Sequence, residues 1–405
     1  MNEFASPRRC HSTRIHPMRS AVLLLPLCVA TTNICPGQTS AVPDSHASLK
    51  QEVQLAYARG LNFLRSQQDE QTGQWGQAEP VAFTGLASAS FLLAPGRDFA
   101  DPVPPEAERG LRYLLGNAKP DGGIYTEARA NYNTALAVMA LLLDPASEED
   151  ATLLAARRFL IRHQMDLDSP GTNDNPLDGG IGYGDDKGYH ADLSNTVFAL
   201  EALHYSEKLL ADRGDALKNE PKLNYAAAID FIQRCQNRSE SNPASWVSKD
   251  PADKGGFIYN PVETRGGKVE NPDGTVSLRS YGSISYAGLL SFIYAGLGQD
   301  DPRVEAVLQW LSENYTVEEN PGLGEQGLFY YYHTMAKALA ISGRTFLTLP
   351  DGQKVDWRED LATRLLNLQK GNGSWVNDTG RWMESDPVLT TGYTLLALAR
   401  IHSSL

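Results

Sequence analysis

The sequence feature that most constrains the fold is a unit that recurs six times. Each copy starts with an amphipathic helix, passes through a turn with glycine and an aromatic residue, and ends in a second helix rich in alanine and leucine. The first helices cover residues 60–67, 110–115, 156–164, 228–234, 306–311 and 362–369. Because units of this kind stack against their neighbours, we expect one helical repeat fold.

The two kinds of helix differ in how their apolar residues are distributed. The first kind has one apolar stripe beside a polar face, as where Phe63 and Leu64 precede Arg65. The second kind is apolar almost all round, as in residues 133–143. A helix with one stripe borders solvent, whereas a helix that is apolar on all sides must be enclosed. About twelve helices of alternating kind predict an all-α fold in two concentric rings, with the enclosed helices inside.

The turns and the starts of the second helices set the register of the repeat. The turns fall at residues 73–76, 121–125, 179–183, 255–257, 327–329 and 373–375. The second helices are expected to start near Thr84, Asn133, Ser194, Tyr286, His333 and Thr391. Residues 236–279 interrupt the fourth unit and are rich in proline, glycine and asparagine, which predicts an irregular insertion, either a loop or a cap.

The N-terminal 41 residues differ from the rest of the chain. Four arginines (Arg8, Arg9, Arg14 and Arg19) precede an apolar run at 21–30, and small residues follow at 38–41. This order is typical of a secretory signal peptide. We expect residues 1–41 to be removed and the protein to be exported, to the periplasm or the medium, with residues 42–405 as one domain. A frayed N-terminal helix is the structural alternative, and a lipid anchor at Cys28 is a minor one.

Charge and cysteine content exclude several classes of function. The formal net charge of -13 argues against a nucleic-acid partner, because phosphate binding needs a basic surface. Only Cys235 lies outside the expected leader, so residues 42–405 can form no internal disulfide and no cysteine cluster for a metal. We expect no cofactor and, outside the apolar run at 21–30, no membrane span.

The six helix pairs, with glutamine before a Gly-Trp type of turn, resemble the squalene cyclase and protein prenyltransferase repeat family. The resemblance covers residues 50–405 and is closest to exported bacterial members. It implies an (α/α)6 toroid, which agrees with the two rings expected from periodicity. It also implies that the inner helices begin around a central cavity, which holds isoprenoid chains in the family's enzymes.

The resemblance implies an acid motif that this sequence only partly keeps. Squalene-hopene cyclases protonate an alkene through Asp-x-Asp-Asp-Thr, and the matching residues here are Asp192, Ser194, Asn195 and Thr196. Protonating an alkene requires a strong, desolvated acid, which paired carboxylates provide and a serine hydroxyl does not. Helix capping explains the same residues without catalysis.

The zinc site of the prenyltransferases is also incomplete. Ser283 stands where the family has cysteine, and no carboxylate lies at the aspartate position. His333 matches the family's Tyr-His-Thr, but one histidine alone does not make a tetrahedral zinc site. We therefore expect no bound metal.

Tyrosines and polar residues cluster at the expected starts of the inner helices. If these starts converge, they form one cup that binds an apolar or amphiphilic ligand, isoprenoid-like or a peptide; packing of the rings against each other is the alternative. The candidate catalytic residues are Asp192 and His333. The candidate ligand-binding residues are Tyr132, Asn133, Tyr189, His190, Ser194, Asn195, Tyr281, Ser283, Tyr286, Tyr331, Tyr332 and Tyr393.

Three functions are compatible with these observations. The first is a binding protein for an isoprenoid-like ligand. The second is a diverged enzyme, either a terpenoid cyclase or a lyase or hydrolase that uses Asp192 and His333 as acid and base. The third is a scaffold of the cell envelope. The sequence alone does not decide whether the protein is an enzyme, and it leaves the oligomeric state open.

Overall fold

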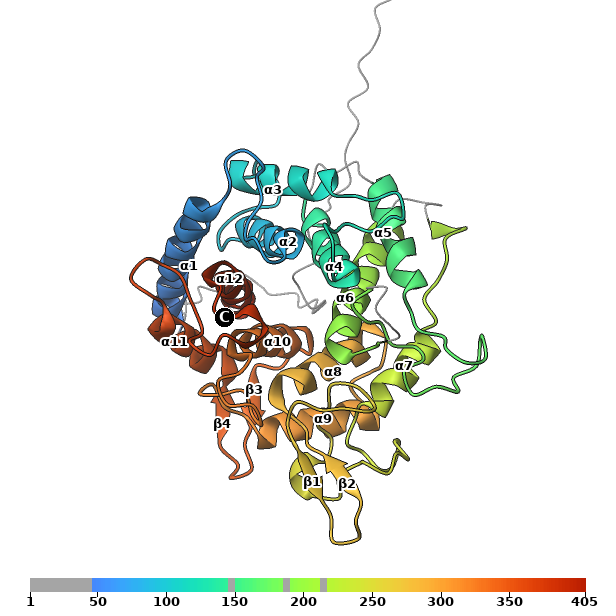
Figure 1. The fold of residues 1–405 in the computed structure, drawn as a ribbon. Helices are drawn as coiled ribbons and strands as arrows, with labels where there is room; N and C mark the ends of the chain where they lie inside the picture. The colour runs from blue at the N-terminus through green and yellow to red at the C-terminus, as the bar shows by residue number, and fades with distance from the viewer. Residues whose placement is uncertain (1–45, 145–149, 185–189, 212–216) are drawn as a thin grey trace, which may run out of the picture.

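The computed structural model describes residues 46–144, 150–184, 190–211 and 217–405, which contain twelve α-helices. The outer helices are α1 (Ala47–Gln67), α3 (Pro105–Gly116), α5 (Asp150–Arg162), α7 (Tyr225–Arg234), α9 (Pro302–Glu313) and α11 (Trp357–Leu368). The inner helices are α2 (Pro80–Leu92), α4 (Ala130–Leu141), α6 (Leu193–Ala211), α8 (Gly282–Tyr294), α10 (Leu328–Ile341) and α12 (Pro387–Ser404). The predicted all-α toroid with two concentric rings is confirmed (Figure 1).

The inner ring is closed rather than open. Each inner helix packs against the next one in the order α2, α4, α6, α8, α10 and α12, and α12 packs back against α2. The outer ring closes at the same place, where α1 contacts both α11 and α12 (Figure 1). All residues of α2 from Val81 to Leu92 are buried, as a helix that is apolar on all sides requires. Stretches far apart in sequence therefore meet around one central axis.

In the units that have it, the glutamine of the repeat joins its turn to the next outer helix or to the residue that precedes that helix. The Gln68 side chain donates to the carbonyl oxygen of Gly73 in its own turn at 2.8 Å and to that of Glu106 in α3 at 3.0 Å. The Gln369 side chain donates in the same way to Gly373 and to Ala56 of α1, both at 2.9 Å. The second of these pairs closes the outer ring between the last unit and the first.

The turns need glycine because they touch the backbone of the next outer helix. Gly179 has φ +85°, and a Cβ there would lie 1.9 Å from the carbonyl oxygen of Ala227. A side chain is excluded both by the left-handed conformation and by this contact. The residue two positions later, Ile181, donates its backbone N–H to the hydroxyl of Thr196 at 2.9 Å. Equivalent bonds join Trp75 to Thr84 and Trp375 to Thr391.

The prediction of a turn at residues 327–329 is wrong. Gly327 is the residue before α10, and Leu328 and Phe329 already lie in the first turn of that helix. The backbone N–H groups of Phe329 and Tyr330 instead donate hydrogen bonds to the carboxylate of Glu384. An acidic side chain at the helix start thus replaces the turn seen in other units, which fits the positive end of the helix dipole.

Outside the helices the chain forms short elements. Strands β1 (Lys268–Glu270) and β2 (Val276–Leu278) pair antiparallel, with Val269 opposite Ser277, and lie in the insertion at 236–279 together with the 3-10 helix η2 (Pro251–Asp253). Strands β3 (Phe346–Thr348) and β4 (Lys354–Asp356) form a second hairpin between α10 and α11, and the 3-10 helix η3 (Arg381–Met383) precedes α12. Among the described residues, no helix combines the length and the apolar character that a membrane span needs.

Candidate functional site

A large cavity lies where the inner helices begin. It holds about 940 Å³ of space free of protein atoms, part of it open to solvent. We call it the tyrosine cavity because six tyrosines line it: Tyr132, Tyr183, Tyr259, Tyr281, Tyr330 and Tyr393. The other lining residues are Arg129, Ser194, Asn195, Phe198, Arg265, Ser283, Trp382, Met383, Glu384 and Leu389. A concave, largely aromatic site with a few polar groups is typical of binding sites for small molecules.

Half of the predicted ligand-binding residues line this cavity. They are Tyr132, Ser194, Asn195, Tyr281, Ser283 and Tyr393, which come from the first turns of α4, α6 and α8, the second turn of α12, or the position directly before α8. These six residues therefore meet around one cavity, as the convergence of the inner-helix starts predicts. Tyr189 lies outside the described residues.

Four of the other predicted residues have structural contacts instead. Asn133 is buried, accepts the N–H of Ala82 and donates to Glu79, so it joins α2 to α4. The hydroxyls of Tyr331 and Tyr332 donate to the carbonyl oxygens of Thr316 and Val317. Tyr286 is buried with its ring 5.7 Å from that of Tyr331. These residues contact neighbouring parts of the fold and do not line the cavity.

Asp192 is a fully buried carboxylate next to the cavity. Its oxygens accept from the backbone N–H of Asn195 at 2.9 Å and from the Asn195 side chain at 2.7 Å. Nε2 of His190 lies 3.3 Å from Asp192 Oδ2, and this contact raises the pKa of His190, against the effect of its partial burial. The hydroxyl of Thr196 donates to the backbone carbonyl of Asp192 at 2.7 Å. The motif thus caps α6, as the capping alternative expected.

The structure does not bring Asp192 and His333 together. His333 lines a second cavity, whose other residues come from the middle and the C-terminal halves of the inner helices. Its ring lies 5.2 Å from that of Tyr393, but only Tyr393 lines the tyrosine cavity. Burial lowers the pKa of His333 well below its usual value, and Lys337 and Arg400 act in the same direction. The expected acid and base pair has no geometric support, because no contact joins the two side chains.

The floor of the tyrosine cavity is a layer of four rings. Tyr132 contacts Phe198 edge to face at 5.3 Å between centroids, and the hydroxyls of Tyr132 and Tyr393 lie 3.1 Å apart. Tyr330 lies 6.1 Å from Phe198 and 6.0 Å from Tyr393. Burial raises the pKa of Tyr132 to about 12, and it also raises that of Tyr330 and Tyr393. These phenols are therefore neutral at physiological pH and offer hydrogen bonds and π faces, but no charge.

The charged side chains of the cavity, Arg129, Arg265 and Glu384, come from three segments that the motif analysis did not single out. Arg129 lies 5.9 Å over the Tyr183 ring and is paired with Glu79, while Arg265 lies 4.6 Å over the Tyr259 ring and is paired with Glu263. Tyr259 and Arg265 belong to the insertion at 236–279, which therefore forms part of the cavity wall. Tyr183 and Tyr259 each lie two residues after the apolar residue of a turn, and this spacing is the signal that could have identified them.

Glu384 is the carboxylate that lines the cavity. It is 1% exposed, accepts from Asn377 at 2.7 Å and from the N–H of Tyr330 at 2.8 Å. Burial raises its pKa, although these hydrogen bonds act in the opposite direction. The two preceding residues, Trp382 and Met383, have φ of 55° and 66°. Left-handed backbone at consecutive non-glycine residues is costly and is often found at functional sites.

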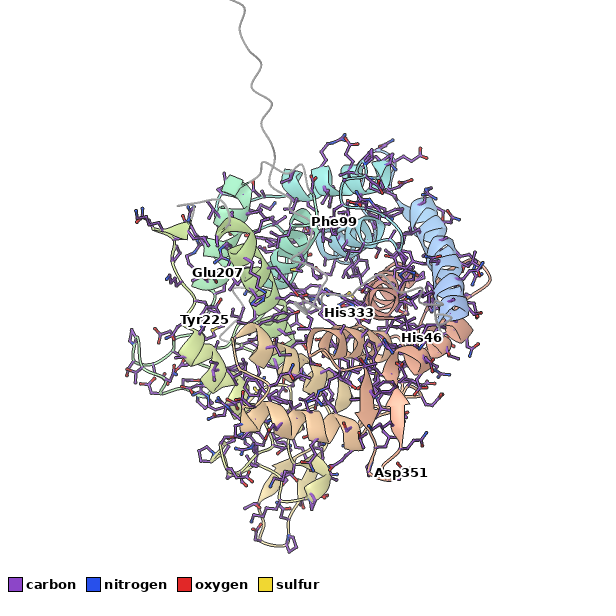
Figure 2. All side chains as sticks on the ribbon, turned by 180° about the vertical axis from the view of Figure 1, so that it is seen from behind. His46, Phe99, Glu207, Tyr225, His333 and Asp351 are labelled. Atoms are coloured by element: carbon purple, nitrogen blue, oxygen red, sulfur yellow. The ribbon has the colours of Figure 1, made fainter. Side chains whose placement is uncertain are left out.

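A possible group of metal ligands lies away from both cavities. His46, Asp356 and Glu359 place ligand atoms within 4.8 Å of one another. His46 directly precedes α1 and is labelled in Figure 2, while Asp356 directly precedes α11 and Glu359 lies in it. Both oxygens of Asp356 are already bonded by the Arg358 guanidinium, and His46 pairs with Glu359 at 2.9 Å. Internal ion pairs therefore account for this cluster.

Comparison with solved structures places the fold among terpenoid cyclase-like toroids. The type II terpene cyclase MstE from Scytonema, in complex with its product merosterolic acid A, matches with a TM-score of 0.51 and 13% identity over 88% of this chain and 99% of its own. The apo structure of MstE matches with a TM-score of 0.50 and 12% identity over the same shares. No protein-family model matches the sequence, and no curated protein matches it either. At this identity the likeness shows the fold alone.

Proposed function

We propose that the protein binds a small apolar or amphiphilic, isoprenoid-like ligand in the tyrosine cavity. The observation that carries this proposal is that six tyrosines, Phe198 and Trp382 surround one open cavity at the starts of the inner helices. Aromatic walls bury large apolar area and accept flat or branched hydrocarbon chains. The terpenoid cyclase-like fold supports the same class of ligand, because MstE forms a complex with a terpene cyclase product in a toroid of this kind.

The position of the charges suits a ligand with one polar end. Arg129 and Arg265 lie over rings of the cavity wall, and Ser194, Asn195 and Ser283 add hydrogen-bonding groups. A polar end would lie near these groups, while the hydrocarbon part contacts Phe198 and Leu389. A peptide with an apolar side chain is the competing ligand, and a scaffold without a ligand is the other competing function.

Native mass spectrometry and organic extraction of the purified protein test the proposal. A terpenoid or other apolar small molecule is expected to copurify with the wild type and to be lost from the Ser194→Trp variant, whose indole would fill the cavity. The matched control is Ser239→Trp, which places the same side chain at an exposed loop position. Copurification of a peptide, or equal loss from both variants, would count against an isoprenoid-like ligand.

Acid catalysis in the same cavity is a second candidate function, and Glu384 is the residue that favours it. Its carboxyl lines the cavity, and burial raises its pKa, so it holds a proton to higher pH than an exposed glutamate. Ser194 stands at the position of the family's acid, and the Asp192 carboxylate is occupied by Asn195 and His190. The test is incubation with isoprenoid alcohols, followed by product analysis. Turnover that disappears in Glu384→Gln while binding persists would establish the enzyme.

We also propose that residues 1–41 direct export and that residues 42–405 fold as one domain. The support is the order of arginines, apolar run and small residues in the sequence. N-terminal sequencing of the protein recovered from the periplasm or the medium tests export, with a new N-terminus expected near residue 42. Recovery of the full-length chain from the cytoplasm would contradict it.

A further inference from the structure

A second cavity lies at the other end of the inner ring. It is lined from α2, α4, α6, α10 and α12, and it holds about 560 Å³ of space free of protein atoms, part of it open to solvent. We call it the Lys337 cavity; its polar lining residues are Glu201, His333, Lys337 and Arg400. Seen from the back of the molecule, His333 lies near the centre of the ring (Figure 2). Met139, Leu396 and Arg400 are half-buried at its rim.

The Lys337 cavity contains buried polar atoms without protein partners. His333 is 3% exposed, and neither of its ring nitrogens makes a hydrogen bond. The Glu201 carboxylate is 2% exposed and accepts from Lys337 Nζ at 2.7 Å through Oε2, while its Oε1 has no partner. Buried polar groups are nearly always paired, and an unpaired one destabilises the fold. An imidazole held in this state beside a cavity is a binding group for a ligand that enters it.

The charges of the cavity sum to one positive charge. Lys337 and Arg400 are basic residues and Glu201 is an acidic one. Burial lowers the pKa of His333, and it also lowers that of Lys337, on which the paired Glu201 acts in the opposite direction. The remaining lining residues are aliphatic or glycine, among them Leu86, Leu136 and Leu396. Inside a site of low dielectric, one excess cation favours a ligand with a single negative charge. The apolar wall favours a ligand whose other end is a hydrocarbon.

We propose that the Lys337 cavity is a second ligand site, which takes a small amphiphile with one carboxylate on an aliphatic chain. The carboxylate pairs with Arg400 and Lys337 and accepts the N–H of His333, and the chain lies against the leucines. This site is independent of the proposed function, because the two cavities share no lining residue.

Isothermal titration with octanoate tests the proposal, with octan-1-ol as the neutral probe of the same chain length. Octanoate is expected to bind the wild-type protein at one site at least tenfold more tightly than octan-1-ol. Arg400→Gln, a change at the half-buried rim, is expected to remove this difference. Met139→Trp is expected to abolish binding of both probes by filling the cavity, and Ser194→Trp in the tyrosine cavity is expected to leave both affinities unchanged.

Three results would overturn the second site. One is the absence of saturable octanoate binding, and another is octan-1-ol binding as tightly as octanoate. The third is octanoate binding that survives Met139→Trp and is lost in Ser194→Trp, which would move the ligand to the tyrosine cavity and leave the proposed function intact. Failure of the proposed function appears separately, as an isoprenoid that neither copurifies with the protein nor responds to Ser194→Trp.

Discussion

The two ends of the inner ring are built on different principles. At the N-terminal ends, every complete turn uses the same glycine, apolar residue and hydroxyl, and the tyrosines gather there. The second cavity takes its charges from residues without counterparts in the other units: α2, α4 and α8 contain no charged residue, while Glu201, Lys337 and Arg400 come one each from the other three inner helices. Repeated residues hold the ring together, whereas residues that occur once give each cavity its chemistry.

The largest effect is expected where the repeat touches backbone. Gly179→Ala places a Cβ against the carbonyl oxygen of Ala227 at 1.9 Å, so unfolding free energy is expected to fall by more than about 3 kcal/mol. Gly96→Ala is the matched control, with φ +82° and no atom within 4 Å, and is expected to cost about 1–2 kcal/mol. Urea denaturation measures both. Equal losses would mean that the turns do not hold the ring.

The next largest effect is expected at the C-terminal end. Lys337→Met leaves the buried Glu201 carboxylate without its cation, and the expected loss is about 3 kcal/mol. Adding Glu201→Met removes the unpaired charge and is expected to restore most of the loss. Both variants are compared by thermal and urea unfolding. If the double variant is as unstable as the single one, the unpaired charge of Glu201 is not the cause of the lost stability.

A smaller effect is expected on the pH dependence of stability, to which His190 at one end of the ring and His333 at the other contribute with opposite sign. The pKa of His190 is raised by Asp192, so its contribution to stability is present below about pH 6.5 and is lost as pH rises through the folded value. The pKa of His333 is lowered by burial, so it destabilises the fold as pH falls below about 6.5.

The two histidine variants are therefore expected to tilt the stability curve in opposite directions. Between about pH 5 and pH 8, His190→Gln reduces stability mainly on the acid side, whereas His333→Leu increases it there. For His333 the slope changes by at most about 1.4 kcal/mol per pH unit, which corresponds to one proton. Unfolding free energies at a series of pH values measure this. Parallel curves for both variants would contradict the assignment of the two environments.

The smallest effect is expected in the ring layer at the floor of the tyrosine cavity. The hydroxyls of Tyr132 and Tyr393 lie 3.1 Å apart, so a double-mutant cycle with Tyr132→Phe and Tyr393→Phe is expected to give a coupling of about 0.5–1.5 kcal/mol. Chemical denaturation of the four proteins measures it. Additive losses would show that the two phenols do not interact.

The fold could be predicted because it depends on a pattern that occurs six times. The helix periodicity gave the two rings, and the turn residues gave the register of five of the six units. The exception at 327–329 depends on Glu384, which lies 54 residues from Tyr330 in the sequence and bonds its N–H. A contact over that distance leaves no trace in the local pattern.

The tyrosine cavity could be predicted only in part. Residues at the helix starts, such as Tyr132 and Ser283, were identified because convergence of the helices places them together. Tyr331 and Tyr332 were wrongly grouped with them because one residue along a helix rotates a side chain by about 100°. Arg265 and Glu384 come from irregular segments, whose positions depend on tertiary packing. The Lys337 cavity was missed because its charges occur once each.

The most direct test of the central claim is the affinity of the protein for farnesol, measured by isothermal titration on Ser194→Trp and Ser239→Trp. If the closed ring presents the tyrosine cavity as a binding site, Ser239→Trp binds farnesol like the wild type, and Ser194→Trp loses at least tenfold in affinity while its unfolding transition is retained. Equal farnesol affinity of the two variants would contradict the account.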